Sequence, residues 1–130
     1  AVLGAWDRIG PVVFRTSPSG ELAWIQNDII GPTGQRETYE LADIVTDSGG
    51  NTYVVGAGTT VRYPLPITPQ ITRQGFIAKL DPDGNRLWFR EIPPSSTINA
   101  VTVLSDGTIA TAGSAQVDNR RVLNIILFDP

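Results

Sequence analysis

The chain contains an internal repeat, and this repeat restricts the possible folds more than any other feature of the sequence. Residues 15–25 read RTSPSGELAWI and residues 79–89 read KLDPDGNRLWF, with Pro, Gly and Trp at matching positions. Repetition of this kind is typical of solenoids, propellers and arrays, in which each repeat is one supersecondary unit. We therefore expect several similar units packed side by side.

Two further pairs of segments follow the same pattern. ELADIVTDSGGNTYVVGAG at 40–58 is matched by INAVTVLSDGTIATAG at 98–113, and FIAKLDP at 76–82 is matched by NIILFDP at 124–130. Helices are not expected, because 13 glycines and 10 prolines interrupt the chain too often. Short runs rich in Val, Ile, Thr, Phe and Trp between turn residues predict strands.

The spacing of these runs predicts four β-hairpins and one further strand. Each hairpin turn contains Gly, which adopts a positive φ without steric penalty, and Pro18 and Pro82 suit the first turn corner. A positive φ is expected at Gly20, Gly49, Gly50, Gly84 and Gly107. The predicted strand pairs are 12–17 with 21–26, 41–47 with 52–58, 75–81 with 86–92 and 98–105 with 108–113, and the last strand is 122–128.

The predicted strands fall into units of four, designated a, b, c and d in chain order. Residues 1–5 resemble a b strand, so the chain reads b-c-d, a-b-c-d, a-b-c. This predicts one domain, residues 1–130, which consists of a partial unit (1–38), a complete unit (39–92) and a partial unit (93–130). The b and c strands should be joined by surface loops at 5–11, 59–74 and 114–121.

The segments FIAKLDPDGNRLWFREI and INAVTVLSDGTIATAG resemble the repeat of a bacterial seven-bladed β-propeller family, often called the SBBP repeat. The resemblance implies antiparallel four-stranded blades around an axis, in extracytoplasmic proteins. We therefore expect an all-β fold of propeller-like blades, and a location outside the cell or on the surface of a bacterium or archaeon. The resemblance carries no fixed set of catalytic residues.

The number of units is too small for a ring. A closed propeller needs at least about four blades, and this chain supplies roughly two and a half. Three arrangements remain open: a piece of a longer propeller, self-assembly through unpaired strand edges, and an open β-sandwich. The expected partner is therefore protein, either a second copy or the rest of a larger propeller.

The expected function is that of a non-catalytic structural or protein-interaction module, which associates with itself through open strand edges. The alternative is a fragment of an extracellular propeller enzyme or carbohydrate-binding protein. The residues expected at the interface lie on the terminal segments and on the Pro-rich loop: Val2, Leu3, Trp6, Tyr63, Val122, Ile125 and Leu127.

Composition argues against several other functions. The chain has no His and no Cys, so it lacks the commonest general base and any thiolate nucleophile or ligand, and we do not expect an enzyme. A net charge of −3 without a basic cluster argues against nucleic acid as a partner. No apolar run is long enough to span a bilayer. Because the chain begins with Ala and contains no Met, we expect a processed, excised or engineered polypeptide.

The turn at Asp81, Asp83 and Asn85 is a weak candidate for a calcium site, because a hard cation prefers oxygen ligands at alternating positions. The matching turn at 17–21 lacks both carboxylates, so a structural turn is the favoured interpretation, and no other cofactor is expected. Trp24 and Trp88 should pack between adjacent units rather than form a platform for sugar.

Overall fold

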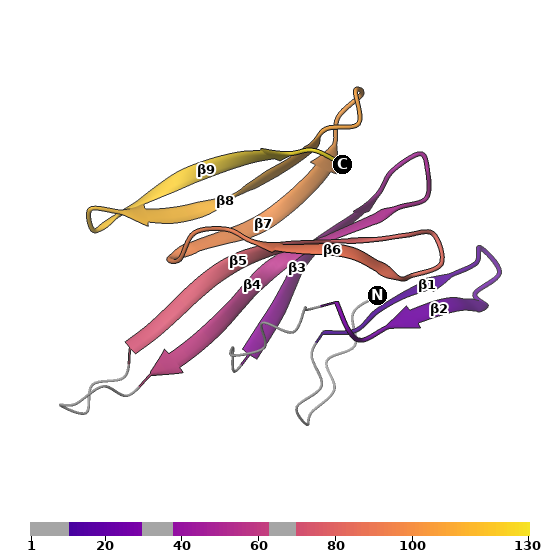
Figure 1. The fold of residues 1–130 in the computed structure, drawn as a ribbon, viewed down its shortest axis with the longest axis horizontal. Coiled ribbons are helices and arrows are strands. Elements are labelled where there is room, and N and C mark those ends of the chain that lie inside the picture. The colour runs from indigo at the N-terminus through magenta and orange to yellow at the C-terminus, as the bar shows by residue number, and fades with distance from the viewer. Residues whose placement is uncertain (1–10, 30–37, 63–69) are drawn as a thin grey trace.

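The computed structural model describes residues 11–29, 38–62 and 70–130, and in these residues the chain is all-β (Figure 1). Strands recur with short turns between them, and no helix occurs within these ranges. The strands are β1 (Val13–Thr16), β2 (Leu22–Gln26), β3 (Thr38–Thr46), β4 (Thr52–Arg62), β5 (Gln70–Leu80), β6 (Arg86–Glu91), β7 (Ser96–Val103), β8 (Ile109–Val117) and β9 (Arg120–Phe128).

The same turn closes four of the hairpins. The N–H of its first residue donates to the carbonyl of its fifth, and the N–H of its glycine donates to the carbonyl of the first. The glycine φ values lie between 84° and 90°, in the left-handed region that favours glycine. These glycines are Gly20, Gly50, Gly84 and Gly107. The prediction is correct for these four and wrong for Gly49, because Gly50 takes the left-handed position of that turn.

The strands group into three units. β3, β4, β5 and β6 pair in sequence as an antiparallel meander, which we call the central unit. β1 and β2 form the first unit, a separate two-stranded sheet. β7, β8 and β9 form the last unit, and a single parallel bridge from Gln74 to Ser96 joins it to the central unit.

Two of the predicted loops are wrong. The segment 59–74 is mostly a long hairpin arm, because β4 and β5 continue to pair from Thr59 with Arg73 out to Arg62 with Gln70. Its β-branched residues favour strand, and the prolines that suggested a loop lie outside the described residues. The segment 114–121 consists of the ends of β8 and β9, joined by a tight two-residue turn in which Asp118 and Asn119 have φ of 48° and 62°. Two consecutive positive φ values are typical of the type I′ hairpin turn. The predicted loop at 5–11 falls almost wholly outside the described residues.

The first two strands of the a-b-c-d unit, β3 with β4 and β7 with β8, approach each other closely at a bulge. Ala42 and Asn99 are the extra residues, and a glycine lies near each bulge on the partner strand. A Cβ on Gly56 would lie 2.0 Å from the carbonyl oxygen of Glu40, and the equivalent distance at Gly113 is 1.8 Å. No side chain fits at these two positions, so the bulge and the glycine form one structural element that recurs with the repeat.

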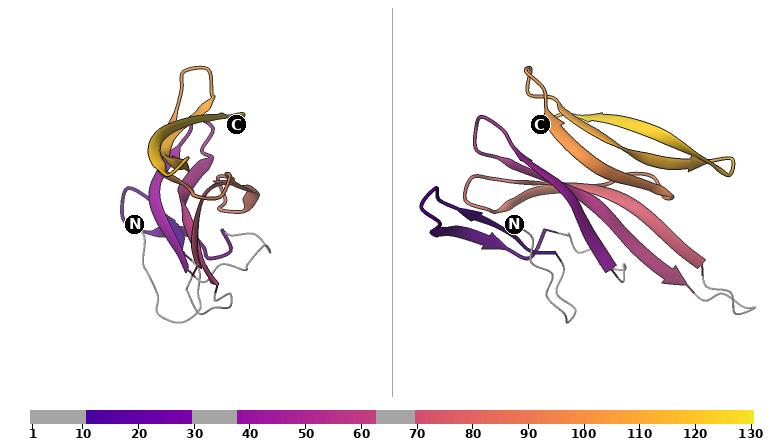
Figure 2. Two further views of the ribbon diagram at one scale, coloured as in Figure 1. Left: turned by 90° about the vertical axis from the view of Figure 1, so that its left-hand side faces the viewer. Right: turned by 180° about the vertical axis from the view of Figure 1, so that it is seen from behind.

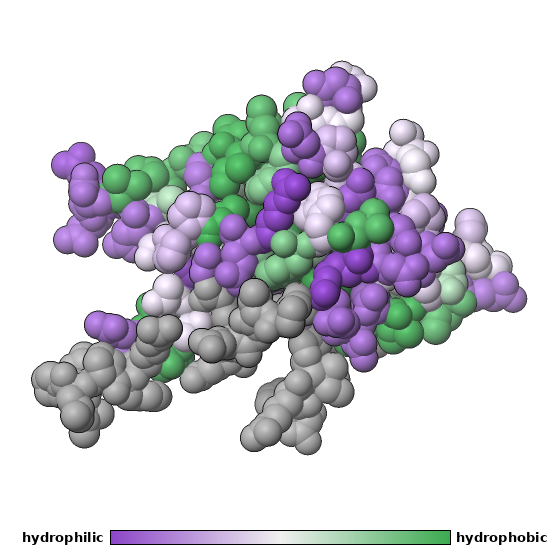
Figure 3. Space-filling model, in the orientation of Figure 1, coloured by the Kyte–Doolittle hydropathy of each residue, from purple (hydrophilic) through white to green (hydrophobic). Residues whose placement is uncertain are grey.

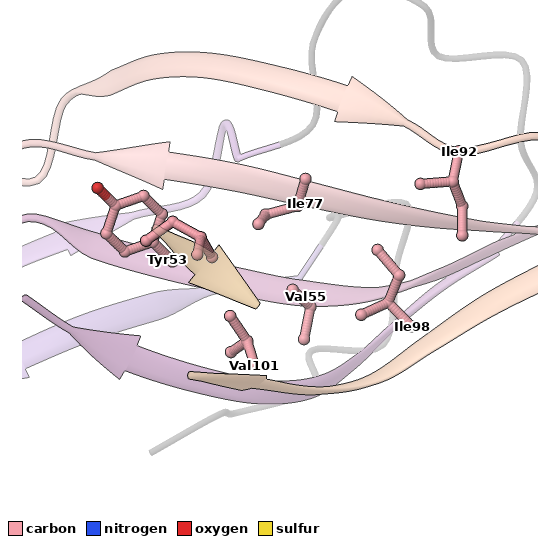
Figure 4. Close-up of a cluster of buried hydrophobic side chains, with 7 residues drawn as sticks. Tyr53, Val55, Ile77, Ile92, Ile98 and Val101 are labelled. Atoms are coloured by element: carbon pink, nitrogen blue, oxygen red, sulfur yellow. The ribbon is translucent and has the colours of Figure 1, made fainter. Parts of the chain in front are cut away.

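The central unit is covered on both faces (Figure 2). Its forward face, which carries Tyr53, Val55 and Ile77, packs against Ile98 and Val101 of the last unit (Figure 4). Its rear face consists of Val54, Ala78 and Leu80 and packs against Val13 and Ile29. The units are therefore stacked in chain order, and every junction joins the forward face of one unit to the rear face of the next.

The stacked open sheets fit the β-sandwich alternative. Within residues 11–29, 38–62 and 70–130, the strands do not close into a ring. The all-β class is confirmed.

Candidate interaction surface

Trp24 connects the first unit to the central unit. Its indole Nε1–H donates to the carbonyl oxygen of Pro82 at 2.9 Å, and the ring lies so close to Gly84 that a Cβ there would come within 2.5 Å of it. Gln26 also donates from Nε2 to the carbonyl oxygen of Gly84, at 3.0 Å. The turn of the central unit is thus held by two side chains of the preceding unit, and Trp24 packs between units as predicted.

Asp43 connects the central unit to the last unit. It lies beside the bulge in β3, and its Oδ2 accepts a hydrogen bond from the backbone N–H of Val101 at 3.0 Å. Its Oδ1 accepts from the N–H of Ile44 at 2.9 Å. Because both oxygens are engaged by backbone, this carboxylate positions strands β3 and β7 relative to each other.

The second tryptophan lies on the forward face of the central unit. Trp88 packs against Tyr53 with ring centroids 6.2 Å apart and an interplanar angle of 54°. The guanidinium carbon of Arg90 lies 4.6 Å from the centroid of the Trp88 ring. This cation–π contact covers part of the indole.

An apolar row runs along β9. The side chains of Leu123, Ile125 and Leu127 are 75%, 69% and 61% exposed, and they alternate, so they lie on one face of the sheet. Their cross-strand partners on β8 are Ser114, Ala112 and Ala110. Figure 3 shows hydrophobic residues gathered along this part of the molecule. A continuous exposed patch of this kind is typical of an interaction site.

Register identifies this row as the forward face of the last unit. Gly56 pairs with Phe76 across β4 and β5, and Gly113 pairs with Asn124 across β8 and β9. Counted from these pairs, Ile125 takes the place of Ile77. The other matched positions on β4 and β8 are Val55 with Ala112 and Tyr53 with Ala110. The same face is buried in the central unit and exposed in the last unit.

The first unit exposes its rear face at the other end of the stack. Phe14 pairs with Ile25 across β1 and β2, as Ala78 pairs with Phe89 across β5 and β6. Ala78 and Phe89 contribute to the rear face of the central unit, which the first unit covers. On the first unit itself, Phe14 is half-buried and Ile25 is 62% exposed. The two ends of the stack therefore expose faces of complementary type.

The hairpin carboxylates serve the turns. Partial burial raises the pKa of Asp47, but hydrogen bonds from the side chain and backbone of Asn51 and from the hydroxyl of Tyr53 outweigh it and leave this pKa below its usual value. Burial, together with the hydrogen bond to Asp47 and its negative charge, raises the pKa of Tyr53 to about 12. Asp106 accepts the N–H of Thr108 at 2.9 Å, as expected for an aspartate in a turn.

The turn proposed as a calcium candidate, at Asp81, Asp83 and Asn85, also uses its carboxylate to accept hydrogen bonds within the turn. Oδ1 of Asp81 accepts the N–H groups of Asp83 and Asn85, and Oδ2 accepts from Nδ2 of Asn85. Hydrogen bonds from the side chain and backbone of Asn85 lower the pKa of Asp81. The amide of Asn85 thus directs its nitrogen, not its oxygen, at the carboxylate. Among the residues with described positions, no three His, Cys, Asp or Glu side chains group as a metal site would require.

Of the predicted interface residues, three lie on β9. Ile125 and Leu127 lie on the forward face, while Val122 lies on the other face and is 40% exposed. Leu123 lies in the edge strand 122–128 that was predicted to form the interface but was not singled out, although its spacing of two from Ile125 places both side chains on the same face. The remaining predicted residues, Val2, Leu3, Trp6 and Tyr63, lie outside the described residues.

Comparison with protein-family models, with curated proteins and with solved structures finds no significant match to this chain. A search of the described residues for a helix long and apolar enough to cross a membrane also finds none.

Proposed function

We propose that this chain is a non-catalytic structural and protein-interaction module of propeller-type units, which associates with copies of itself through the forward face of the last unit. The observation that carries this proposal is the exposed row Leu123, Ile125 and Leu127. This row occupies, in register, the position of a face that is buried between units elsewhere in the same chain.

The size of the row suits a reversible contact. Complete burial of three large aliphatic side chains contributes roughly 5–9 kcal/mol, and association costs at least about 4 kcal/mol in lost freedom of motion. The net free energy therefore favours a weak complex, with neighbouring alanines and Ser114 adding contact area. At the upper end of this range the net is about 5 kcal/mol, which corresponds to a Kd of about 0.2 mM, so we expect self-association at protein concentrations of several hundred micromolar and above.

The stacking order supports a head-to-tail arrangement. Within the chain, each forward face meets a rear face, so a second copy would dock its first unit, with Phe14 and Ile25, on the exposed forward face. A contact between two different surfaces is heterologous, and repeated addition produces a ring or a fibre. The a-b-c-d order of the central unit supports the propeller-type interpretation, and the sequence resemblance is the basis for proposing an extracytoplasmic location.

The test combines two variants that each disable one face. The I125E/L127E variant places charge on the forward face of the last unit, and the I25E variant places charge on the rear face of the first unit. All three substitutions are at exposed positions. Each variant alone should remain near the 14.0 kDa protomer mass in size-exclusion chromatography with light scattering. A mixture should form a one-to-one dimer, because each variant retains the face that the other lacks.

The matched control is Ile71→Glu, which charges a side chain that is 68% exposed on β5 of the central unit and therefore lies on neither of the two end units. It should assemble like the unchanged protein. The proposal is overturned if the unchanged protein stays at protomer mass at several hundred micromolar, or if Ile71→Glu disrupts assembly as strongly as I125E/L127E does.

A further inference from the structure

We propose that the outer edge of β9 is a strand-addition site, which binds an extended segment of the β6 type supplied by another polypeptide. This site is the backbone edge of the sheet, whereas the proposed self-association uses its face. In the part of the chain that the structure describes, β5 has neighbours on both sides, β4 and β6, but β9 pairs only with β8. An unpaired edge offers a row of backbone donors and acceptors to an added strand.

The binding of β6 to β5 shows what such a ligand requires. β6 runs antiparallel to β5, with Phe76 opposite Glu91 and Lys79 opposite Trp88. Beyond the backbone pairing, Phe89 stacks on Phe76 with ring centroids 5.4 Å apart. An arriving segment therefore needs extended backbone and two side chains that reach opposite faces of the sheet.

β9 repeats the geometry of β5. Its pairing with β8, from Ile109 with Phe128 to Gly113 with Asn124, has the same register as the pairing of β5 with β4. In that register, the tryptophan of a β6-type segment would lie opposite Leu127, on the forward face. The residue paired with Leu127 on β8 is Ala110, whereas the equivalent residue of the central unit is Tyr53. The smaller alanine side chain leaves room for the indole.

Asn124 gives the site a specificity that β5 lacks. It takes the place of Phe76, and its Oδ1 is buried with no hydrogen-bond partner among the described residues. A buried acceptor without a partner is unfavourable, so a segment that brings a donor to it gains affinity. The donor belongs at the position of Phe89. The predicted ligand is thus an extended strand with Leu-Trp followed by a donor such as Gln.

The experiment uses fluorescein-labelled peptides of residues 86–92, RLWFREI, and fluorescence anisotropy with the unchanged protein. The Phe89→Gln peptide should bind about fivefold more tightly than the parent peptide, as one added hydrogen bond allows. The Trp88→Ala peptide should bind about tenfold more weakly. An Arg90→Pro peptide should not bind, because Arg90 stands in a hydrogen-bonded pair with β5 and proline removes the backbone donor that faces the neighbouring strand. Amide hydrogen exchange should slow at residues 124–128.

A protein variant completes the test. Asn124→Leu should abolish the preference for the Phe89→Gln peptide, while binding of the parent peptide is retained. The proposal is overturned if a scrambled peptide binds as well as RLWFREI, if no peptide binds, or if the protected amides lie on β2 or β6. Peptide binding and self-association are separate measurements, so either result can fail without the other.

Discussion

Replacement of Gly56 by Ala provides a direct test of the bulge that recurs in the repeat. The new Cβ would lie 2.0 Å from the carbonyl oxygen of Glu40, and ordinary contacts begin at 3.4 Å, so β3 and β4 would have to separate by about 1.4 Å. A backbone hydrogen bond stretched by this amount exceeds its useful length. The loss of one or two buried backbone bonds, with the overpacking itself, predicts a destabilisation of about 3–5 kcal/mol.

The assay is urea unfolding followed by tryptophan fluorescence. For a small domain with m of about 1–3 kcal/mol/M, a loss of this size lowers the midpoint by roughly 1–5 M. It also removes a large part of a total stability of about 5–15 kcal/mol. The equivalent Gly113→Ala, whose Cβ would lie 1.8 Å from the carbonyl oxygen of Thr97, should behave in the same way.

Gly49→Ala is the matched control. A Cβ at Gly49 would meet only the side chains of Asp47 and Asn51, at 3.3 Å and 3.4 Å, and its φ is not in the left-handed region. Replacement of glycine at a compatible position stabilises by about 0.4–1 kcal/mol through the unfolded chain. If Gly56→Ala also leaves the midpoint unchanged or raises it, the argument from steric overlap is refuted.

Three further predictions concern single side chains. Trp24→Phe removes the donor to the Pro82 carbonyl and should lower the free energy of unfolding by about 1 kcal/mol in urea titrations. The pKa of Tyr53 is about 10 in the unfolded chain and about 12 in the folded protein. The free energy of unfolding should therefore be unaffected by Tyr53 below pH 10 and should fall by about 2–3 kcal/mol as the pH rises to 12. The Tyr53→Phe variant should lack this alkaline decline. Asn124→Leu should raise the melting temperature, because about 1–2 kcal/mol of unfavourable burial disappears; an unchanged or lower value would count against that assignment.

The hairpins were predictable because their signals are local. Glycine, together with proline or aspartate, marks each of the four repeated turns, and the order of strands in the central unit follows from the repeat. The errors also have local causes. Prolines between 63 and 69 suggested a loop that would cover 59–74, although Thr and Ile on either side favour strand, and Asp118-Asn119 was not recognised as a turn that needs two positive φ values.

The contacts between units could not be predicted from the sequence. Nothing local indicates that Asp43 accepts the N–H of Val101, or that Trp24 lies on Gly84. These pairs depend on how the units are stacked, and the repeat pattern does not fix that stacking. The exposed row on β9 was partly predictable, since its residues are spaced by two along a predicted strand, but its role depends on the register that aligns it with a buried face.

The stacking of forward on rear faces also bears on how such a chain could lengthen. An in-frame duplication of the gene segment for residues 39–92 would insert a module whose two surfaces already match those on either side. Its two outer junctions would repeat those of its parent, and only the junction between the two copies, a forward face on a rear face, would be new. The number of modules could therefore change during evolution without a poorly packed intermediate protein.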